Sequence, residues 1–117
     1  MNKRKIGAQY EQEAVLFLQK NGVRILEQNF RNRIGEIDII GGYQNTILFI
    51  EVKYRKDTRT GQPAEAVGYQ KQRIISHVAD FYRMKHQMGD DLCYRFDVIG
   101  ILGDQITWYQ DAFSYIR

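Results

Sequence analysis

The stretch that decides the fold is "ILFIEVKYR", residues 47–55. Isoleucine, leucine, phenylalanine and valine dominate it, and a short apolar run of this kind predicts a buried β-strand. Glu51 and Lys53 interrupt the run at alternate positions. Because alternate residues of a strand point to the same face, the acid and the base are expected to project side by side, about 6.5–7 Å apart. The sequence therefore places two opposite charges in its most strand-like segment.

A second acid lies in the preceding strand. The segment "GEIDIIGG", residues 35–42, carries Asp38 among isoleucines, and the polar turn that follows predicts a β-hairpin with residues 46–55. If the hairpin turns around Gln44, Asp38 lies opposite Glu51 or one cross-strand pair away, and opposed Cβ atoms are about 4.5–5.5 Å apart. Two carboxylates at that distance repel, and burial raises the cost. A divalent cation would remove both penalties, and oxygen ligands suit Mg²⁺ or Mn²⁺.

Lys53 has a role in such a site. An ammonium beside the metal could orient or help to deprotonate the attacking water, or stabilise charge on a phosphate. Asp38 followed by Glu51-Val52-Lys53 on paired strands therefore fits metal-assisted phosphodiester hydrolysis. The alternative is a charged, solvated face of the hairpin in which Lys53 only bridges Glu51. The residues alone leave both interpretations open.

The other segments complete one α/β (α+β) domain, expected to span residues 1–117. Helical periodicity predicts a first helix from about Lys5 to Lys20, followed by a strand at residues 23–30. A second helix is expected from about Ala64 to Gln87, with a break at Gly68. Residues 92–102 and 105–110 read as a closing hairpin. The predicted order is α-β-β-β-α-β-β.

Two further acids have different expected roles. At about 100° per residue, Glu11 falls beside the apolar stripe of the first helix, so it is a candidate third carboxylate; a solvated acid at the helix edge is the alternative. Asp97 is a strand acid among apolar neighbours. It is expected to pair with Arg95 or with a cation of a helix rather than to join the acidic site.

Composition excludes several classes of protein. With one cysteine (Cys93) and two histidines, the chain can form no intramolecular disulfide framework and no cysteine- or histidine-rich metal site. No apolar run reaches the about 18 residues that span a membrane, and the basic start leads into a polar periodic segment rather than a signal peptide. A soluble cytoplasmic protein is expected. The formal net charge of +3 permits a nucleic-acid partner without requiring one.

Several short motifs, spread over almost the whole chain, carry a resemblance to a known family. They are Gly7 with Glu11 and Ala14, "NGVRIL" (21–26), "NFRNRIGEIDII" (29–40), "LFIEVKYR" (48–55), "GQPAEAV" (61–67), "KQRI" (71–74), "RFDVI" (95–99) and "DAF" (111–113). In these the chain resembles the YraN-type family of small bacterial proteins, which belongs to the PD-(D/E)xK nuclease-like superfamily.

The resemblance implies a restriction-endonuclease-like core, with a mixed central sheet flanked by helices. It implies metal-ligating acids at Asp38 and Glu51, a catalytic lysine at Lys53 and a helix-borne acid at Glu11. One position departs from the family pattern, which usually has glycine directly before the helix glutamate. Here that residue is Tyr10, whose ring is expected to change access to Glu11.

Two functions follow as expectations. The first is a Mg²⁺- or Mn²⁺-dependent endonuclease, acting on DNA rather than RNA, with the backbone carbonyl of Val52 as a third metal ligand and a homodimer as one arrangement of such enzymes. The second is a non-catalytic nucleic-acid-binding accessory module on the same fold. Tyr54 and Tyr69 are candidate stacking partners for bases. Basic residues near the site are candidates for phosphate contacts: Arg31, Arg33, Arg55, Lys71 and Arg73.

Overall fold

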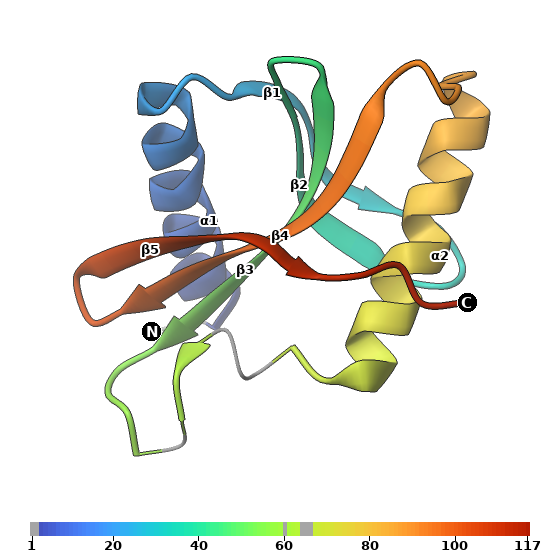
Figure 1. The fold of residues 1–117 in the computed structure, drawn as a ribbon. Helices are drawn as coiled ribbons and strands as arrows, with labels where there is room; N and C mark the ends of the chain where they lie inside the picture. Colours follow the sequence, from blue (N-terminus) through green and yellow to red (C-terminus); the bar gives the residue numbers. More distant parts are fainter. Residues whose placement is uncertain (1–2, 60, 64–66) are drawn as a thin grey trace.

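A computed structural model describes residues 3–59, 61–63 and 67–117. Its five strands form one sheet in the order β1-β2-β3-β4-β5, with one helix on each face (Figure 1). The elements are α1 (Lys3–Lys20), β1 (Arg24–Arg31), β2 (Glu36–Tyr43), β3 (Thr46–Arg55), α2 (Tyr69–Lys85), β4 (Cys93–Leu102) and β5 (Gln105–Phe113). This is the predicted order of elements, and the expected mixed α+β fold is confirmed.

The sheet is mixed because a helix separates two of its neighbouring strands. β1, β2 and β3 follow one another as antiparallel hairpins, and β4 and β5 form another. β3 and β4 are parallel from Thr46↔Cys93 to Arg55↔Leu102. Parallel neighbours need a crossover, which α2 supplies. β3, the strand first recognised in the sequence, therefore lies at the centre of the sheet.

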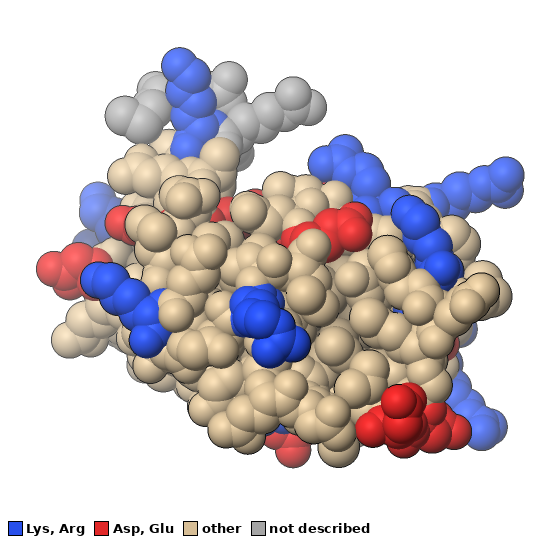
Figure 2. All heavy atoms as spheres, turned by 90° about the horizontal axis from the view of Figure 1, so that it is seen from above, with Lys and Arg blue, Asp and Glu red and all other residues tan. Residues whose placement is uncertain are grey.

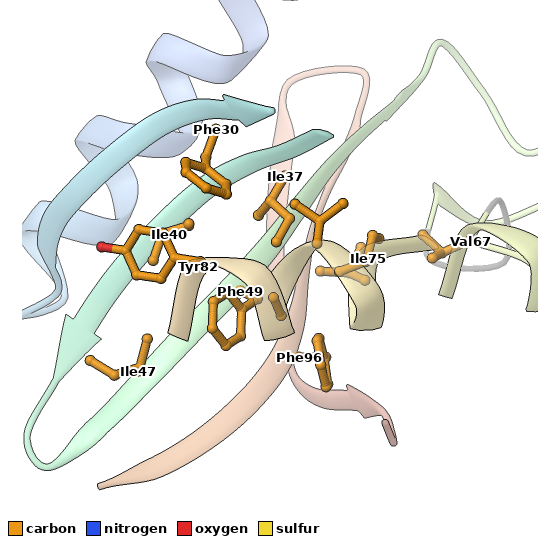
Figure 3. Packing of buried hydrophobic residues seen from close by; sticks show 12 residues of the cluster. Phe30, Ile37, Ile40, Ile47, Phe49, Val67, Ile75, Tyr82 and Phe96 are labelled. Carbon is orange, nitrogen blue, oxygen red and sulfur yellow. The ribbon is translucent and has the colours of Figure 1, made fainter. Parts of the chain in front are cut away.

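Each face of the sheet has its own apolar core. Alternation along β3 sends Ile47 and Phe49 to the face covered by α2, and Leu48 and Ile50 to the face covered by α1. Figure 3 shows the α2-side core, in which Tyr82 lies beside Phe30 and Phe49. With apolar layers on both faces, any charge in the middle of β3 is buried.

The boundaries refine the sequence predictions. α1 starts two residues before the predicted Lys5, and β5 runs three residues beyond the predicted end. α2 begins at Tyr69 after the extended Gly68, so Gly68 marks the start of the helix; residues 64–66 of the predicted helix lie outside the described residues. No helix in the described part of the chain has the length and apolar character needed to cross a bilayer.

Candidate active site

The candidate site lies where strand β2 separates from strand β3. The hairpin turns at Gln44 and Asn45, and its ladder runs from Tyr43↔Thr46 to Ile39↔Ile50, where it ends. β1 and β2 stay paired beyond that point, as far as Arg31↔Glu36. The β1–β2 hairpin therefore separates from β3 at Asp38, the residue directly before Ile39.

Two irregularities in the backbone accompany the separation. Ile37 packs in the α2-side core and Ile39 in the α1-side core, although residues two apart on a regular strand share a face. The alternation is thus interrupted at Asp38. In the register of β1 and β2, Asn29 lies opposite Asp38, and it has a left-handed backbone conformation with φ of 54°. Asparagine tolerates this region better than most residues.

The Asp38 side chain replaces a backbone partner in the opening. Its Oδ2 accepts a hydrogen bond of 2.8 Å from the N–H of Val52. Continued at the same register, the ladder would have offered that N–H the carbonyl of Ile37 instead. Because the N–H and C=O of one strand residue point to the same side, the Val52 carbonyl also faces the opening. The structure thus directs a carboxylate and a backbone carbonyl, both predicted metal ligands, into one gap.

Glu51 is the second carboxyl group of this gap. Its side chain is 5 % exposed, which excludes the solvated face considered as an alternative for this hairpin. Burial, a hydrogen bond to the Asp38 carboxyl group and the charge of Asp38 raise the pKa of Glu51 to about 9, against the opposing charges of Lys71 and Lys53. At neutral pH Glu51 therefore keeps its proton. The predicted contact between the two acids is confirmed, although they form no ladder pair.

The nearest cation to Glu51 comes from α2, the helix on the face of the sheet that α1 does not cover. Lys71, in the first turn of α2, places its Nζ 3.7 Å from Oε2 of Glu51. Lys53 acts on Glu51 through its charge, and the effect of Lys71 is the larger of the two. Sequence analysis assigned Lys71 to phosphate binding, because no spacing along the chain shows that the crossover helix starts beside β3.

Glu11 reaches the same gap from α1. Burial, the charge of Asp38 and the charge of Glu36 raise the pKa of Glu11 to about 7, and a hydrogen bond from Asn29 opposes the shift. With its amide nitrogen facing the two acids, Asn29 donates to Glu11 at 2.9 Å and to Glu36 at 2.8 Å. Sequence analysis missed Asn29 and Glu36. An asparagine inside a strand is the one signal that could have drawn attention to the left-handed residue at this position.

The three acids of the site line one hollow of about 330 Å³. Glu11, Asp38, Glu51 and Val52 line it, together with Tyr10 and other residues of α1 and β3. Tyr10 stacks on Tyr54 with ring centroids 3.9 Å apart and an interplanar angle of 13°. The Tyr10 ring therefore forms part of the wall of the acidic hollow.

The five predicted phosphate contacts do not form one patch. Arg31 lies 3.7 Å from Glu36 and lines a second hollow beyond Glu11, and Lys71 contacts Glu51. Arg33 lines a separate hollow with Ile34 and Phe81, and Arg73 donates to the carbonyl of Arg117. Arg55 ends β3. On the face shown in Figure 2, basic side chains are dispersed among acidic and neutral ones. Arg31 and Lys71 alone among the five contact or line the acidic region.

Asp97 has the structural role that the sequence predicted. It is fully buried on β4, and Arg95 donates to both of its oxygens at 2.8 Å. Trp108 Nε1 donates at 2.8 Å and the N–H of Asp111 at 2.9 Å. Its oxygens are satisfied by protein donors, so this acid holds β5 against β4 and leaves no oxygen free for a metal.

The donors present in the gap fit a divalent cation. The Oε2 atom of Glu51 is buried and accepts no hydrogen bond from the described residues. A cation could replace the proton that Glu51 keeps beside Asp38, and the Val52 carbonyl points to the same opening. These are hard oxygen donors of the kind that Mg²⁺ and Mn²⁺ take, with water and phosphate completing the shell. Among the described residues no three His, Cys, Asp or Glu side chains cluster as a complete metal site, so protein side chains would supply two ligands.

Comparison with known proteins identifies relatives over most of the chain. The model of "Uncharacterised protein family UPF0102" matches residues 10–101, a range that includes Glu11, Asp38, Glu51 and Lys53. A UPF0102 protein of Vibrio parahaemolyticus is 43% identical over 115 residues, covering 97% of this chain and 95% of the relative. Another from Alkaliphilus oremlandii is 50% identical over 102 residues, covering 86% of each. One from Caldicellulosiruptor saccharolyticus is 45% identical over 101 residues, covering 86% of this chain and 85% of its own.

Proposed function

The chain belongs to the uncharacterised protein family UPF0102, and we propose that it hydrolyses phosphodiester bonds of nucleic acid with Mg²⁺ or Mn²⁺, as a DNA endonuclease. The observation that carries the proposal is that the buried Glu51 lies beside the half-buried Asp38 in one hollow, where Glu51 Oε2 accepts no hydrogen bond from the described residues. Protein cores do not keep two adjacent carboxyl groups for stability, because each costs free energy to bury. A cation-binding role accounts for both.

The metal ligands would be the carboxylates of Asp38 and Glu51 and the carbonyl of Val52. When bound, the ion would supply Lewis-acid stabilisation of negative charge on the phosphate and lower the pKa of water. The Val52 N–H fixes the Asp38 carboxylate. Lys71, at 3.7 Å, favours the ionised form of Glu51 and so favours loss of its proton.

Two further residues, Lys53 and Glu11, could act on the attacking water and the phosphate. Lys53 follows Glu51 by two positions on the same strand, where its ammonium can orient water or neutralise charge on the phosphate. Glu11 faces the hollow from α1 and is held by Asn29. Its pKa of about 7 suits a group that accepts a proton from water at neutral pH.

A cleavage assay tests the proposal. Labelled linear duplex, single-stranded, flap and four-way-junction DNA, together with RNA, are incubated with Mg²⁺ or Mn²⁺ and either the wild-type protein or its Glu51→Gln variant. Glu13→Gln is the matched control, because Glu13 is an exposed acid of the helix that carries Glu11. Metal-dependent cutting by the wild type and by Glu13→Gln, lost in Glu51→Gln, is expected.

The same assay separates the alternatives. Cutting that survives in Glu51→Gln would refute this site as the source of the activity. Salt-sensitive binding without cutting would instead support the non-catalytic accessory module. The choice of DNA over RNA, and any dependence on a second copy of the chain, follow from which substrates are cut and from the dependence of the rate on protein concentration.

A further inference from the structure

The acidic hollow continues along α1 into a second one. The second hollow, of about 640 Å³, is polar, and its lining includes Gln12, Asn29 and Arg31. Gly7 and Glu11 line both hollows. The two together form one groove, termed here the α1 groove, with the tyrosine pair at the acidic end and Arg31 at the other end.

The Tyr10–Tyr54 pair forms one wall of this groove, beside the acids. Tyr10 precedes Glu11 on α1, and Tyr54 follows Lys53 on β3, so the stack links the two elements that supply the site. Both rings are half-buried and pack against the α1-side core, which holds them in place. A hydrogen bond to Tyr54 raises the pKa of Tyr10 to about 12, so this hydroxyl stays neutral at physiological pH. What the pair offers a ligand is therefore an aromatic surface.

The depth of the acids restricts what can reach them. The Glu51 side chain is 5 % exposed and lies between the two layers, where β2 and β3 separate. A phosphate must enter the hollow to approach it. The phosphates of a regular duplex follow a fixed helical path, whereas a single strand can bend into the hollow and present an unpaired base to an aromatic ring.

We propose that the α1 groove binds single-stranded nucleic acid, with an unpaired base stacked on the Tyr10–Tyr54 pair and the neighbouring phosphate directed towards the cation that Asp38 and Glu51 would hold. This inference rests on the proposed function and names its substrate class: a single strand, or an unpaired segment of a branched molecule. Gln12, Asn29 and Arg31 line the path of the strand beyond Glu11 and supply amide and guanidinium donors for its backbone.

Substitution of Gly7 by a large residue is a way to block the groove without disturbing the core. A Cβ built on Gly7 meets nothing within 4 Å, and this residue lines both hollows. Alanine and phenylalanine both favour a helix more than glycine does, so Gly7→Ala and Gly7→Phe are expected to fold. The phenylalanine ring would extend into the groove, while the methyl group of Gly7→Ala would leave most of it open.

The test is binding in EDTA, where removal of divalent ions prevents cutting. Fluorescence anisotropy compares a labelled single strand with a blunt duplex of the same sequence, and 2-aminopurine in the single strand reports stacking. Tyr10→Leu removes one ring of the pair. Tyr115→Leu removes the ring of an exposed tyrosine that binds Asp80 on α2, and serves as its control.

The wild type is expected to bind the single strand more tightly than the duplex and to quench 2-aminopurine. Tyr10→Leu should weaken single-strand binding about 10-fold and abolish the quenching, the size expected for one stacked base. Gly7→Phe should weaken it as well, while Gly7→Ala and Tyr115→Leu should bind as the wild type does. Equal affinity for duplex, or unchanged binding by Tyr10→Leu, would overturn the inference.

Failure of this inference is distinguishable from failure of the proposed function. Metal-dependent cutting that Glu51→Gln abolishes, together with unchanged binding by Tyr10→Leu, would refute the stacking role and leave hydrolysis in place. Stacking-dependent binding of single strands by a protein that cuts nothing would support the groove and refute the hydrolysis.

Discussion

The Asp38 carboxylate accepts the Val52 N–H at 2.8 Å, in the position that a carbonyl of β2 would occupy if the hairpin ladder continued. One side chain thus ends the ladder, satisfies a backbone N–H of the central strand and lies beside Glu51. Where β2 separates from β3, Glu11 from α1 and Lys71 from α2 lie around the same pair of acids. The site depends on this local opening of the sheet.

The role of Asp38 in the backbone predicts different stabilities for two variants. Asp38→Ala leaves the partly buried Val52 N–H without its acceptor and should lower the free energy of unfolding by about 1–3 kcal/mol. Asp38→Asn keeps an acceptor oxygen and should fold with stability close to that of the wild type. Urea unfolding at pH 7 without divalent ions measures both. If alanine and asparagine had equal effects, the hydrogen bond to Val52 would not be the stabilising contact.

The raised pKa of Glu51 predicts how stability depends on pH. Between about pH 4.5 and about 9, the folded protein holds a proton on Glu51 that the unfolded chain has lost. Stability contributed by this group is therefore present at low pH and decreases as pH rises through this window, by at most about 1.4 kcal/mol per pH unit. Glu11 adds a decrease between pH 4.5 and about 7.

Neutral variants separate the two acids. Glu51→Gln should remove the decrease above pH 7 and make the metal-free protein more stable than the wild type at pH 8, whereas Glu11→Gln should change the curve mainly below pH 7. Chemical denaturation at intervals from pH 5 to 9 gives the curves. A wild-type protein whose stability rises from pH 7 to 9 would show that Glu51 is not protonated in the folded state.

Asp97 is predicted to stabilise the fold and to take no part in catalysis. Asp97→Ala leaves Arg95, Trp108 Nε1 and the N–H of Asp111 without their buried acceptor. Loss of one partner of a buried ion pair costs about 3–5 kcal/mol, so the urea midpoint should fall strongly. Where the variant remains folded, its cleavage per folded molecule should equal that of the wild type; a folded variant that no longer cuts would assign Asp97 to the site.

The two lysines near Glu51 are predicted to differ in their effect on its proton. Their charges lower the pKa of Glu51, and Lys71 does so more than Lys53. Lys71→Met should therefore raise the pKa of Glu51 further than Lys53→Met does. The pH dependence of the side-chain carboxyl ¹³C chemical shift in glutamate-labelled protein measures this. A larger shift in Lys53→Met would make Lys53, rather than Lys71, the main counter-charge.

Local patterns were enough to predict the order of the elements and the pair of acids. The strand Thr46–Arg55 and its turn at Gln44 follow from period-two alternation and turn residues, and together they bring Asp38 near Glu51. Asp97 was expected to pair with Arg95 or with a cation of a helix, and the structure shows Arg95, two positions away on the same strand. Each of these contacts is set by short-range geometry, which is why the sequence shows it.

The remaining features depend on packing between distant segments. Nothing local shows that α2 begins beside β3, so the contact of Lys71 with Glu51 was missed. The bridge from Asn29 to Glu11 and Glu36 requires a left-handed residue inside β1, which strand periodicity argues against. The Tyr10–Tyr54 stack likewise needs the packing of α1 on the sheet. Arg33 and Arg73 were grouped with the site by their nearness in sequence, but they lie at other contacts.

The most direct test of the central claim, that Asp38 and Glu51 form a divalent-metal site, is isothermal titration of Mn²⁺ into the protein at pH 7. Buffers with different heats of ionisation are compared, so that the heat of binding also reports the protons released. The wild type and Glu13→Gln should bind the ion and release up to one proton, while Asp38→Asn and Glu51→Gln should bind none. A wild-type protein that binds no ion, or a Glu51→Gln variant that binds it equally well, would contradict the claim.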